Sequence, residues 1–374
     1  MKIRKIALLW MILQAAALLL AGCATHNKDL DPTPPPSVGS EVTEHFSTDA
    51  PVESADETPL KVRDDEAIQE ALYTAISEVR QPQPMEVSSM IWAQTPEIDV
   101  KNLYYEVIDQ HPEFKYAYDI TASVENGLLT CQISYMPYQA GYPQGWHGVP
   151  VDSLPELIET AKSHLGPEPV NIRLTDTTLT PDGMNRALQQ VGGGYILCSL
   201  SRDGTQITYT PPMGMTMEEC LALLEQAEEL AGEAADALID DTMTELERAE
   251  VLYRYLTEHV KYDQRYYADR VNMPYHSQTA IGALRDGVAI CGGYSHALDL
   301  LFEQAGIPCY TVSGKSGSEN HMWNIARLDG QWLWFDATAD RGMSPQFELR
   351  HFAREELDAQ YSWDSTQLDQ LLGE

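Results

Sequence analysis

Apolar residues recur every three to four positions in two early segments, which predicts two amphipathic helices. The first segment contains Ile68, Leu72, Ile76 and Val79, and the second contains Val100, Leu103, Tyr104, Val107 and Ile108. Strand-like alternation around Asn126-Gly127 then predicts a β-hairpin. A second helix over residues 182–191 and a second hairpin around Asp203-Gly204 repeat this order. Residues 65–238 are therefore predicted to form an α+β domain with two helix-hairpin units, a degenerate internal repeat.

Helix-start signals divide the middle of the chain. Pro155 opens a predicted helix, and a Ser/Thr-x-x-Glu capping pattern opens two more. Thr216 and Glu219 begin a helix that runs through Leu238, while Thr244 and Glu247 begin one that ends at His259. No catalytic constellation occurs between residues 65 and 238, so the role of that domain stays open.

The first 22 residues combine a basic start with a 15-residue apolar run from Ile6 to Leu20. That run is shorter than the roughly 20 residues a transmembrane helix needs, and it is typical of a secretory signal. The sequence Leu20-Ala21-Gly22-Cys23 resembles a bacterial lipobox, which implies cleavage before Cys23 and lipid attachment to its thiol. The alternative is an ordinary signal peptide followed by an incidental cysteine. Residues 23–64 are rich in proline and acidic residues, which predicts a disordered tether. We therefore expect a lipid-anchored protein of the bacterial cell envelope, outside the cytoplasm.

The formal charge of the chain is −33, with 24 basic and 57 acidic residues among 374. A nucleic-acid partner needs a basic footprint, so this class of partner is excluded. Anionic lipid surfaces are disfavoured for the folded part, which leaves the N-terminal lipid as the expected membrane contact. The cysteines show neither CxxC pairing nor metal-ligand spacing with histidine, so no metal or cofactor is expected. Disulfides among Cys131, Cys198 and Cys220 stay open.

Two strands near the end of the chain place a histidine beside an acid. Residues 321–328 and 331–338 flank Asp329-Gly330, a pair that favours a two-residue hairpin turn. Such a turn places His321 opposite Thr338 and Trp323 opposite Asp336. His321 and Asp336 are then diagonal neighbours on one face, close enough for their side chains to meet.

Cys291 lies at the predicted start of an amphipathic helix and is followed by Gly292-Gly293. A helix N-terminus favours a thiolate, and the glycines permit close approach of another backbone or a substrate. If this helix packs on the face that carries His321, the three side chains form a nucleophile, a base and an orienting carboxylate.

The Cys-Gly-Gly-Tyr stretch, His321-Met-Trp-Asn and Trp-Phe-Asp336-Ala-Thr resemble the bacterial transglutaminase-like superfamily. The resemblance covers residues 240–364, and it implies a papain-like catalytic domain over residues 239–374 with Cys291, His321 and Asp336 as the triad. It fixes neither the reaction nor the substrate. The backbone N–H of Cys291 is a candidate oxyanion donor, and Gln278 is a weaker one. Gly292, Trp323 and Trp334 are candidate cleft residues, although both tryptophans would equally fill the interface beneath the cysteine helix.

The primary hypothesis is Cys-dependent acyl transfer on amide or peptide bonds through a thioester intermediate. The acyl group passes either to water, as in a peptidase or amidase, or to an amine, as in a transglutaminase. Hydrolysis is slightly favoured, because water is always available outside the cell. The alternative is a cell-surface binding or structural module for cell-wall peptide or a protein partner. Transfer from a small thioester donor is a weaker option, since no nucleotide-binding motif is present.

Overall fold

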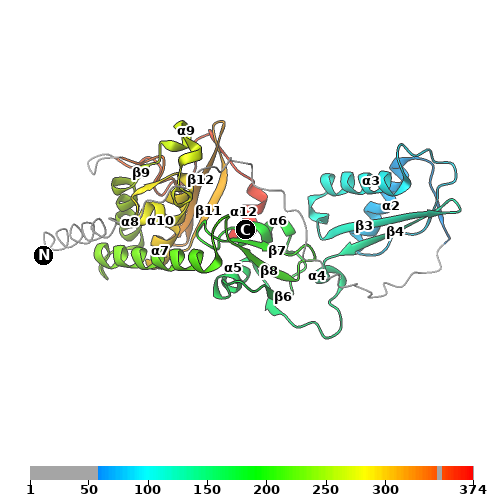
Figure 1. The fold of residues 1–374 in the computed structure, drawn as a ribbon, viewed down its shortest axis with the longest axis horizontal. Helices are drawn as coiled ribbons and strands as arrows, with labels where there is room; N and C mark the ends of the chain where they lie inside the picture. Colours follow the sequence, from blue (N-terminus) through cyan, green and yellow to red (C-terminus); the bar gives the residue numbers. More distant parts are fainter. Residues whose placement is uncertain (1–57, 343–347, 374) are drawn as a thin grey trace. The chain divides into compact units, whose positions relative to one another are not determined.

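The computed structural model describes residues 58–342 and 348–373, which fall into two compact units (Figure 1). The C-terminal unit contains Gln190–Leu197 and Thr210–Leu368, and the N-terminal unit contains the rest of the described chain. Both units mix helices with sheets, which confirms the predicted α+β class. The expected signal peptide, Cys23 and the tether up to residue 57 lie outside the described residues.

The N-terminal unit contains the same order of elements twice, β-α-β-α-β-β. In each copy the first two strands pair in parallel, and the second strand pairs antiparallel with the last strand, which belongs to the hairpin. The predicted repeat is therefore present in the topology. The first copy comprises β1 (Leu60–Lys61), α2 (Asp65–Ser77), β2 (Met85–Glu86), α3 (Pro96–Gln110), β3 (Ala117–Glu125) and β4 (Leu128–Tyr135). The second comprises β5 (Val149–Val151), α5 (Leu154–Ser163), β6 (Val170–Leu174), α6 (Pro181–Leu188), β7 (Leu197–Leu200) and β8 (Gln206–Thr210), and α4 (Pro137–Ala140) lies between the copies.

The predicted helices and hairpins of this unit are confirmed, except that α2 ends at Ser77, before Val79, whose φ is 51°. Helix α3 buries the five apolar residues from Val100 to Ile108 that predicted it. Asn126 and Gly127 both have positive φ, 53° and 77°, as a type I′ turn requires. The expected tether, however, extended too far. Leu60–Lys61 form β1, Val62 is buried, and Asp64 caps α2, so these residues belong to the fold.

The C-terminal unit is built on an antiparallel sheet of order β13-β12-β11-β14. Its strands are β11 (Cys309–Ser316), β12 (Glu319–Leu328), β13 (Gln331–Phe335) and β14 (Tyr361–Ser362). A second, parallel pair joins β9 (Lys261–Tyr262) to β10 (Val288–Ala289). The helices are α7 (Met217–Leu238), α8 (Glu245–His259), α9 (Arg265–Ala268), α10 (Ala280–Leu284) and α11 (Cys291–Gln304). The last helix, α12 (Ser365–Leu372), is divided between the two units after Leu368. Within the described ranges no helix has the length and apolar composition needed to cross a bilayer.

Helix α7 packs against α10 and α11, which are elements of the C-terminal unit. The compact unit therefore includes residues before the boundary expected at residue 239. The reason is an alanine-rich stripe on α7, from Ala227 to Ala235, that is buried against these helices. Both predicted capping boxes, at Thr216 and Thr244, are formed.

The hairpin of β12 and β13 has the predicted register, with Leu328 paired to Gln331 and Asn324 paired to Phe335. Asp329 and Gly330 both have positive φ in the turn. The second strand ends at Phe335, three residues earlier than expected. Just beyond the strand, the backbone N–H of Asp336 donates to the carbonyl of His351 at 2.9 Å.

Helix α11 packs on the other face of this sheet from the one expected. The amide of Asn324 donates to the carbonyl of Ser295 on α11 at 3.0 Å, and Phe335 contacts Phe302 edge to face. Both residues lie on the sheet face opposite His321 and Trp323. Alternation alone did not reveal this, because both faces of β12 are buried.

The edge of β11 is completed by a side chain. Strand β14 pairs with only Lys315 and Ser316 of β11. Further along that strand, Gln190 accepts from the backbone N–H of Thr311 at 2.7 Å and donates to its carbonyl at 3.1 Å. The amide thus takes the place of a neighbouring peptide group.

The close packing of Gly293 gives a stability prediction. A Cβ at Gly293 would lie 2.8 Å from the carbonyl oxygen of Ser277 and 2.9 Å from that of Thr279. Because these are backbone atoms, Gly293→Ala is expected to lower the free energy of unfolding by about 1–3 kcal/mol. Gly232→Ala on α7 is the matched control, since its nearest contact would be an ordinary 3.6 Å and alanine favours a helix by up to about 1 kcal/mol. Urea titration measures both; equal effects would contradict the packing argument.

Candidate active site

Cys291 is the first residue of α11, so its N–H has no acceptor within the helix. The residue before it is fixed in place, because the N–H of Ile290 donates to the carbonyl of Ser277 at 2.8 Å. Cys291 is partly exposed and lines a cavity, whereas Cys131, Cys198 and Cys220 are buried thiols outside any disulfide. Burial raises the pKa of Cys131 and of Cys198 to about 12, so neither is a ready nucleophile.

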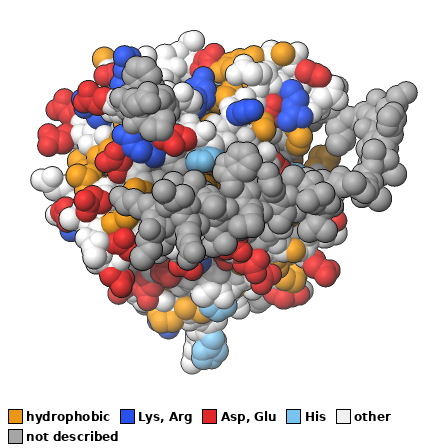
Figure 2. Space-filling model, turned by 90° about the vertical axis from the view of Figure 1, so that its left-hand side faces the viewer, with side chains coloured by type: hydrophobic (Ala, Val, Ile, Leu, Met, Phe, Trp, Pro, Cys, Tyr) orange, Lys and Arg blue, Asp and Glu red, His pale blue; other side chains and the backbone are white. Residues whose placement is uncertain are grey.

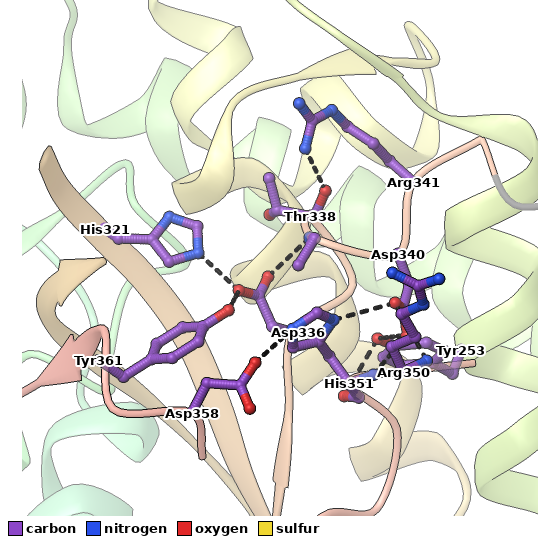
Figure 3. Close-up of polar contacts among 11 residues, drawn as sticks. Tyr253, His321, Asp336, Thr338, Asp340, Arg341, Arg350, His351, Asp358 and Tyr361 are labelled. Atoms are coloured by element: carbon purple, nitrogen blue, oxygen red, sulfur yellow. Dashed lines mark hydrogen bonds and ion pairs between the residues drawn. The ribbon is translucent and has the colours of Figure 1, made fainter. Parts of the chain in front are cut away.

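His321 lies between Cys291 and Asp336. Its Nε2 is 2.7 Å from Oδ2 of Asp336 (Figure 3). This leaves Nδ1 for the hydrogen bond with the thiol of Cys291. Burial by itself lowers the pKa of His321, but hydrogen bonds and charge from Asp336 and Cys291 outweigh it and raise the pKa to about 9. The imidazole is therefore a proton donor at neutral pH.

The carboxylate of Asp336 is 1% exposed and is held from several sides. Its Oδ2 accepts from His321 and from the hydroxyl of Tyr361 at 2.7 Å, and its Oδ1 accepts from the N–H of Ala339 at 3.0 Å. A buried carboxylate with this many donors is fixed in orientation. Asp336 thus sets the tautomer and the angle of the His321 ring.

A second buried carboxylate, that of Asp340, supports the first. It accepts from the hydroxyl of Tyr253 at 3.0 Å, from the backbone N–H of His351 at 2.8 Å and from that of Arg350 at 3.2 Å (Figure 3). The ring of His351 lies 3.1 Å from the same carboxylate. Because the carbonyl of His351 accepts from the backbone of Asp336, this network positions the acid of the triad.

The candidate triad lines a cavity of about 190 Å³. Three tyrosines, Tyr262, Tyr266 and Tyr267, contribute to its wall, and Arg341 and Glu319 bring charge to it. The cavity is thus large enough for a side chain or a short peptide segment beside the thiol. Within the described ranges, no three His, Cys, Asp or Glu side chains converge as a metal site.

The other predicted cleft residues lie elsewhere. Gly292 is buried, and a Cβ on it would lie 3.0 Å from the carbonyl oxygen of Gln278, so this glycine accommodates the chain's own backbone. Trp323 is fully buried against Tyr361, and Trp334 is nearly so, with Trp363 packed on it. Neither tryptophan lines the cavity, and neither lies beneath α11, because they occupy the opposite sheet face. The side chain of Gln278 is exposed and does not line the cavity either.

Three residues of the site carried no signal of their own in the sequence. Tyr361, Tyr262 and Arg341 come from segments without alternation or a motif that points to chemistry. Tyr361 and Tyr262 lie within residues 240–364, the range that resembles the superfamily, and no other feature of the sequence pointed to them. Arg341 follows Asp336 by five residues, beyond the strand in which regular geometry gives an orientation.

Residues 233–337 match the family model of the transglutaminase-like superfamily, so this part of the chain is a transglutaminase-like domain, as its motifs predicted. Kyphoscoliosis peptidase of Homo sapiens is 27% identical over 123 residues, which is 30% of this chain and 18% of that protein. The Mus musculus protein is 26% identical over the same length. The chain thus spans less than a fifth of the length of these curated relatives.

Two solved structures are similar at low identity. The crystal structure of a TGase is 16% identical, with coverage of 79% of this chain and 83% of that chain and a TM-score of 0.29. The periplasmic domain of TgpA from Pseudomonas aeruginosa is 16% identical, with coverage of 38% and 60% and a TM-score of 0.24.

The His321–Cys291 contact predicts the reactivity of the thiol. Because His321 stays protonated up to about pH 9, its charge stabilises a neighbouring thiolate. Alkylation of Cys291 by iodoacetamide near neutral pH is expected to slow on the order of tenfold in His321→Ala. Mass spectrometry of the Cys291 peptide measures the rate, and exposed His259→Ala is the control. Equal rates in all three proteins would remove His321 from the site.

The Asp340–His351 pair predicts a pH-dependent contribution to stability. Burial raises the pKa of Asp340, but hydrogen bonds from His351 and Tyr253 bring it below its ordinary 3.8. The bond to Asp340 raises the pKa of His351 above its ordinary 6.5. The stabilisation that Asp340 gives to the fold is present above pH 3.8 and is lost as the pH falls below that value. The stabilisation that His351 gives is present below pH 6.5 and is lost as the pH rises through the raised pKa of His351.

His351→Gln is therefore expected to cost about 1–3 kcal/mol of unfolding free energy, most of all between the two ordinary pKa values of 3.8 and 6.5. Urea titrations across pH measure this difference. A cost that did not vary with pH would show that the charge of His351 is irrelevant.

Proposed function

We propose that this protein is a cysteine-dependent acyltransferase or hydrolase that acts on amide bonds. The observation that carries the proposal is the geometry of Cys291, His321 and Asp336. A thiol at a helix N-terminus hydrogen-bonds an imidazole, whose other nitrogen bonds a buried carboxylate. This is the arrangement that activates a cysteine nucleophile.

The steps follow from the geometry. The Sγ of Cys291 attacks the carbonyl carbon, and the oxyanion that forms lies near the backbone N–H of Cys291. His321, protonated at neutral pH, donates its Nδ1 proton to the leaving amine as the C–N bond breaks. A thioester on Cys291 remains. His321, now neutral, takes a proton from water or from an amine as that nucleophile attacks the thioester, and the C–S bond breaks to release the Cys291 thiolate beside the protonated imidazole.

The finer form of the proposal is hydrolysis of peptide or protein substrates outside the cytoplasm. Its support is the N-terminal sequence, in which an apolar run leads to Cys23 as a lipid-attachment site. Water is always present there, whereas an amine acceptor has to be recruited. The curated relatives carry the name peptidase, which agrees with hydrolysis.

The test compares the protein with Cys291→Ser and Asp336→Asn on cell-wall peptides and protein substrates, with and without an added primary amine. Cys291→Ser is expected to abolish product formation, and Asp336→Asn to lower kcat by at least about a hundredfold. Released amine without incorporation of the added amine means hydrolysis, and its incorporation means transamidation. Circular dichroism checks that each variant is folded.

The opposite outcome favours the binding module. If Cys291→Ser keeps the full biological function of the protein, that function does not depend on catalysis by Cys291. The duplicated N-terminal unit would then be the part to assay for ligands.

A further inference from the structure

Arg341 lies in the wall of the cavity that contains Cys291 and His321. Its Nη1 donates to the carbonyl of Thr338 at 2.5 Å (Figure 3). Its guanidinium lies 4.7 Å from the ring centre of Tyr262. Both contacts hold the group in place, since stacking on an aromatic ring and a hydrogen bond restrict its rotamers. The cation is thus positioned before any substrate arrives.

No carboxylate in the part of the chain that the structure describes lies within 4.0 Å of the Arg341 guanidinium. Three other arginines of the same unit are paired: Arg254 with Glu250, Arg265 with Asp263, and Arg285 with Asp286. Asp336 lines the same cavity, but its oxygens already accept from His321, Tyr361 and Ala339. Glu319 also lines the cavity, where its carboxylate accepts from the hydroxyl of Tyr267 at 3.2 Å. Arg341 therefore brings to the cavity a guanidinium that is not in an ion pair.

That charge stands out against its surroundings. The chain carries 57 acidic and 24 basic residues, and acidic side chains are spread over the face drawn in Figure 2. Such a surface repels anions in general. A lone guanidinium beside the nucleophile offsets this repulsion at one point. Its planar donors match a carboxylate, which they bind through two parallel N–H···O bonds.

We propose that Arg341 is a specificity-determining residue that binds a carboxylate of the substrate next to the scissile amide. This assignment rests on the proposed function and narrows its substrates to amides that bear a free carboxylate near the bond attacked. The bond to Thr338 uses one of the five N–H donors of the guanidinium, so a purely structural role leaves most of them without use. The carboxylate comes either from an acidic side chain or from a free C-terminus.

The experiment compares an anionic and a neutral alkylating agent on the same thiol. Iodoacetate and iodoacetamide both react through attack of the Cys291 thiolate on the CH₂ carbon, with loss of iodide. Because both need the thiolate, the ratio of their rates cancels its abundance and reports the charge around the incoming group. Arg341→Gln is expected to lower the iodoacetate-to-iodoacetamide ratio about two- to fivefold. Added salt should shrink the difference.

Arg327→Gln is the matched control. Arg327 is also exposed and also donates to a backbone carbonyl, that of Gly330, but it does not line the cavity. Its substitution is expected to leave the ratio unchanged. An unchanged ratio in Arg341→Gln, or an equal fall in Arg327→Gln, would overturn the proposal. Failure of the proposed function looks different: Cys291 then alkylates equally in the protein and in His321→Ala, whatever the ratio.

Protection of Cys291 from iodoacetamide separates the two sources of the carboxylate. The probes are N-acetyl-Ala-Glu-Ala-amide, N-acetyl-Ala-Gln-Ala-amide and N-acetyl-Ala-Gln-Ala with a free C-terminus. Protection by the first alone assigns an acidic side chain, and protection by the third alone assigns a C-terminal carboxylate. Either protection should be lost in Arg341→Gln. Equal protection by all three, including the uncharged peptide, would overturn carboxylate recognition.

Discussion

The carboxylate of Asp336 has to be satisfied without water, and the architecture of the C-terminal unit follows from that requirement. A buried charge costs several kcal/mol unless donors surround it. The donors come from separate parts of the chain: His321 from β12, Tyr361 from β14 and Ala339 from the loop after β13. Each donor ties its segment to the others. The same group that orients the imidazole of His321 thus also fixes the arrangement of the strands beside it.

The sheet separates two kinds of packing. Helix α11 covers one face through Phe302 and Phe335, and aromatic rings around Trp323 fill the other. Cys291 stands at the very start of α11, where the helix meets the end of β12 that carries His321. Cys291 therefore approaches His321 at this end of β12 and not across the sheet face that α11 covers. Cys291 and His321 can therefore line the cavity while the aromatic side chains on both faces of the sheet stay buried.

Local rules predicted much of this arrangement. The Asp329-Gly330 turn determined the register of its hairpin, and the register brought His321 to Asp336. Rules of this kind fail where both faces of a strand are buried. Alternation then does not show which face α11 packs against, or whether Trp323 and Trp334 lie beneath that helix. They also fail for Tyr361 and Arg341, whose places depend on long-range packing and not on spacing along the chain.

The contact between Gln190 and Thr311 bears on how copies of the protein behave toward one another. An uncovered strand edge presents free N–H and C=O groups, and these recruit strands from other molecules into aggregates. Here a single amide occupies both groups of Thr311. It satisfies them without offering a continuing strand, so the sheet cannot be extended at that position. Resistance of this edge to the addition of a further strand thus depends in part on one glutamine far from the chemistry.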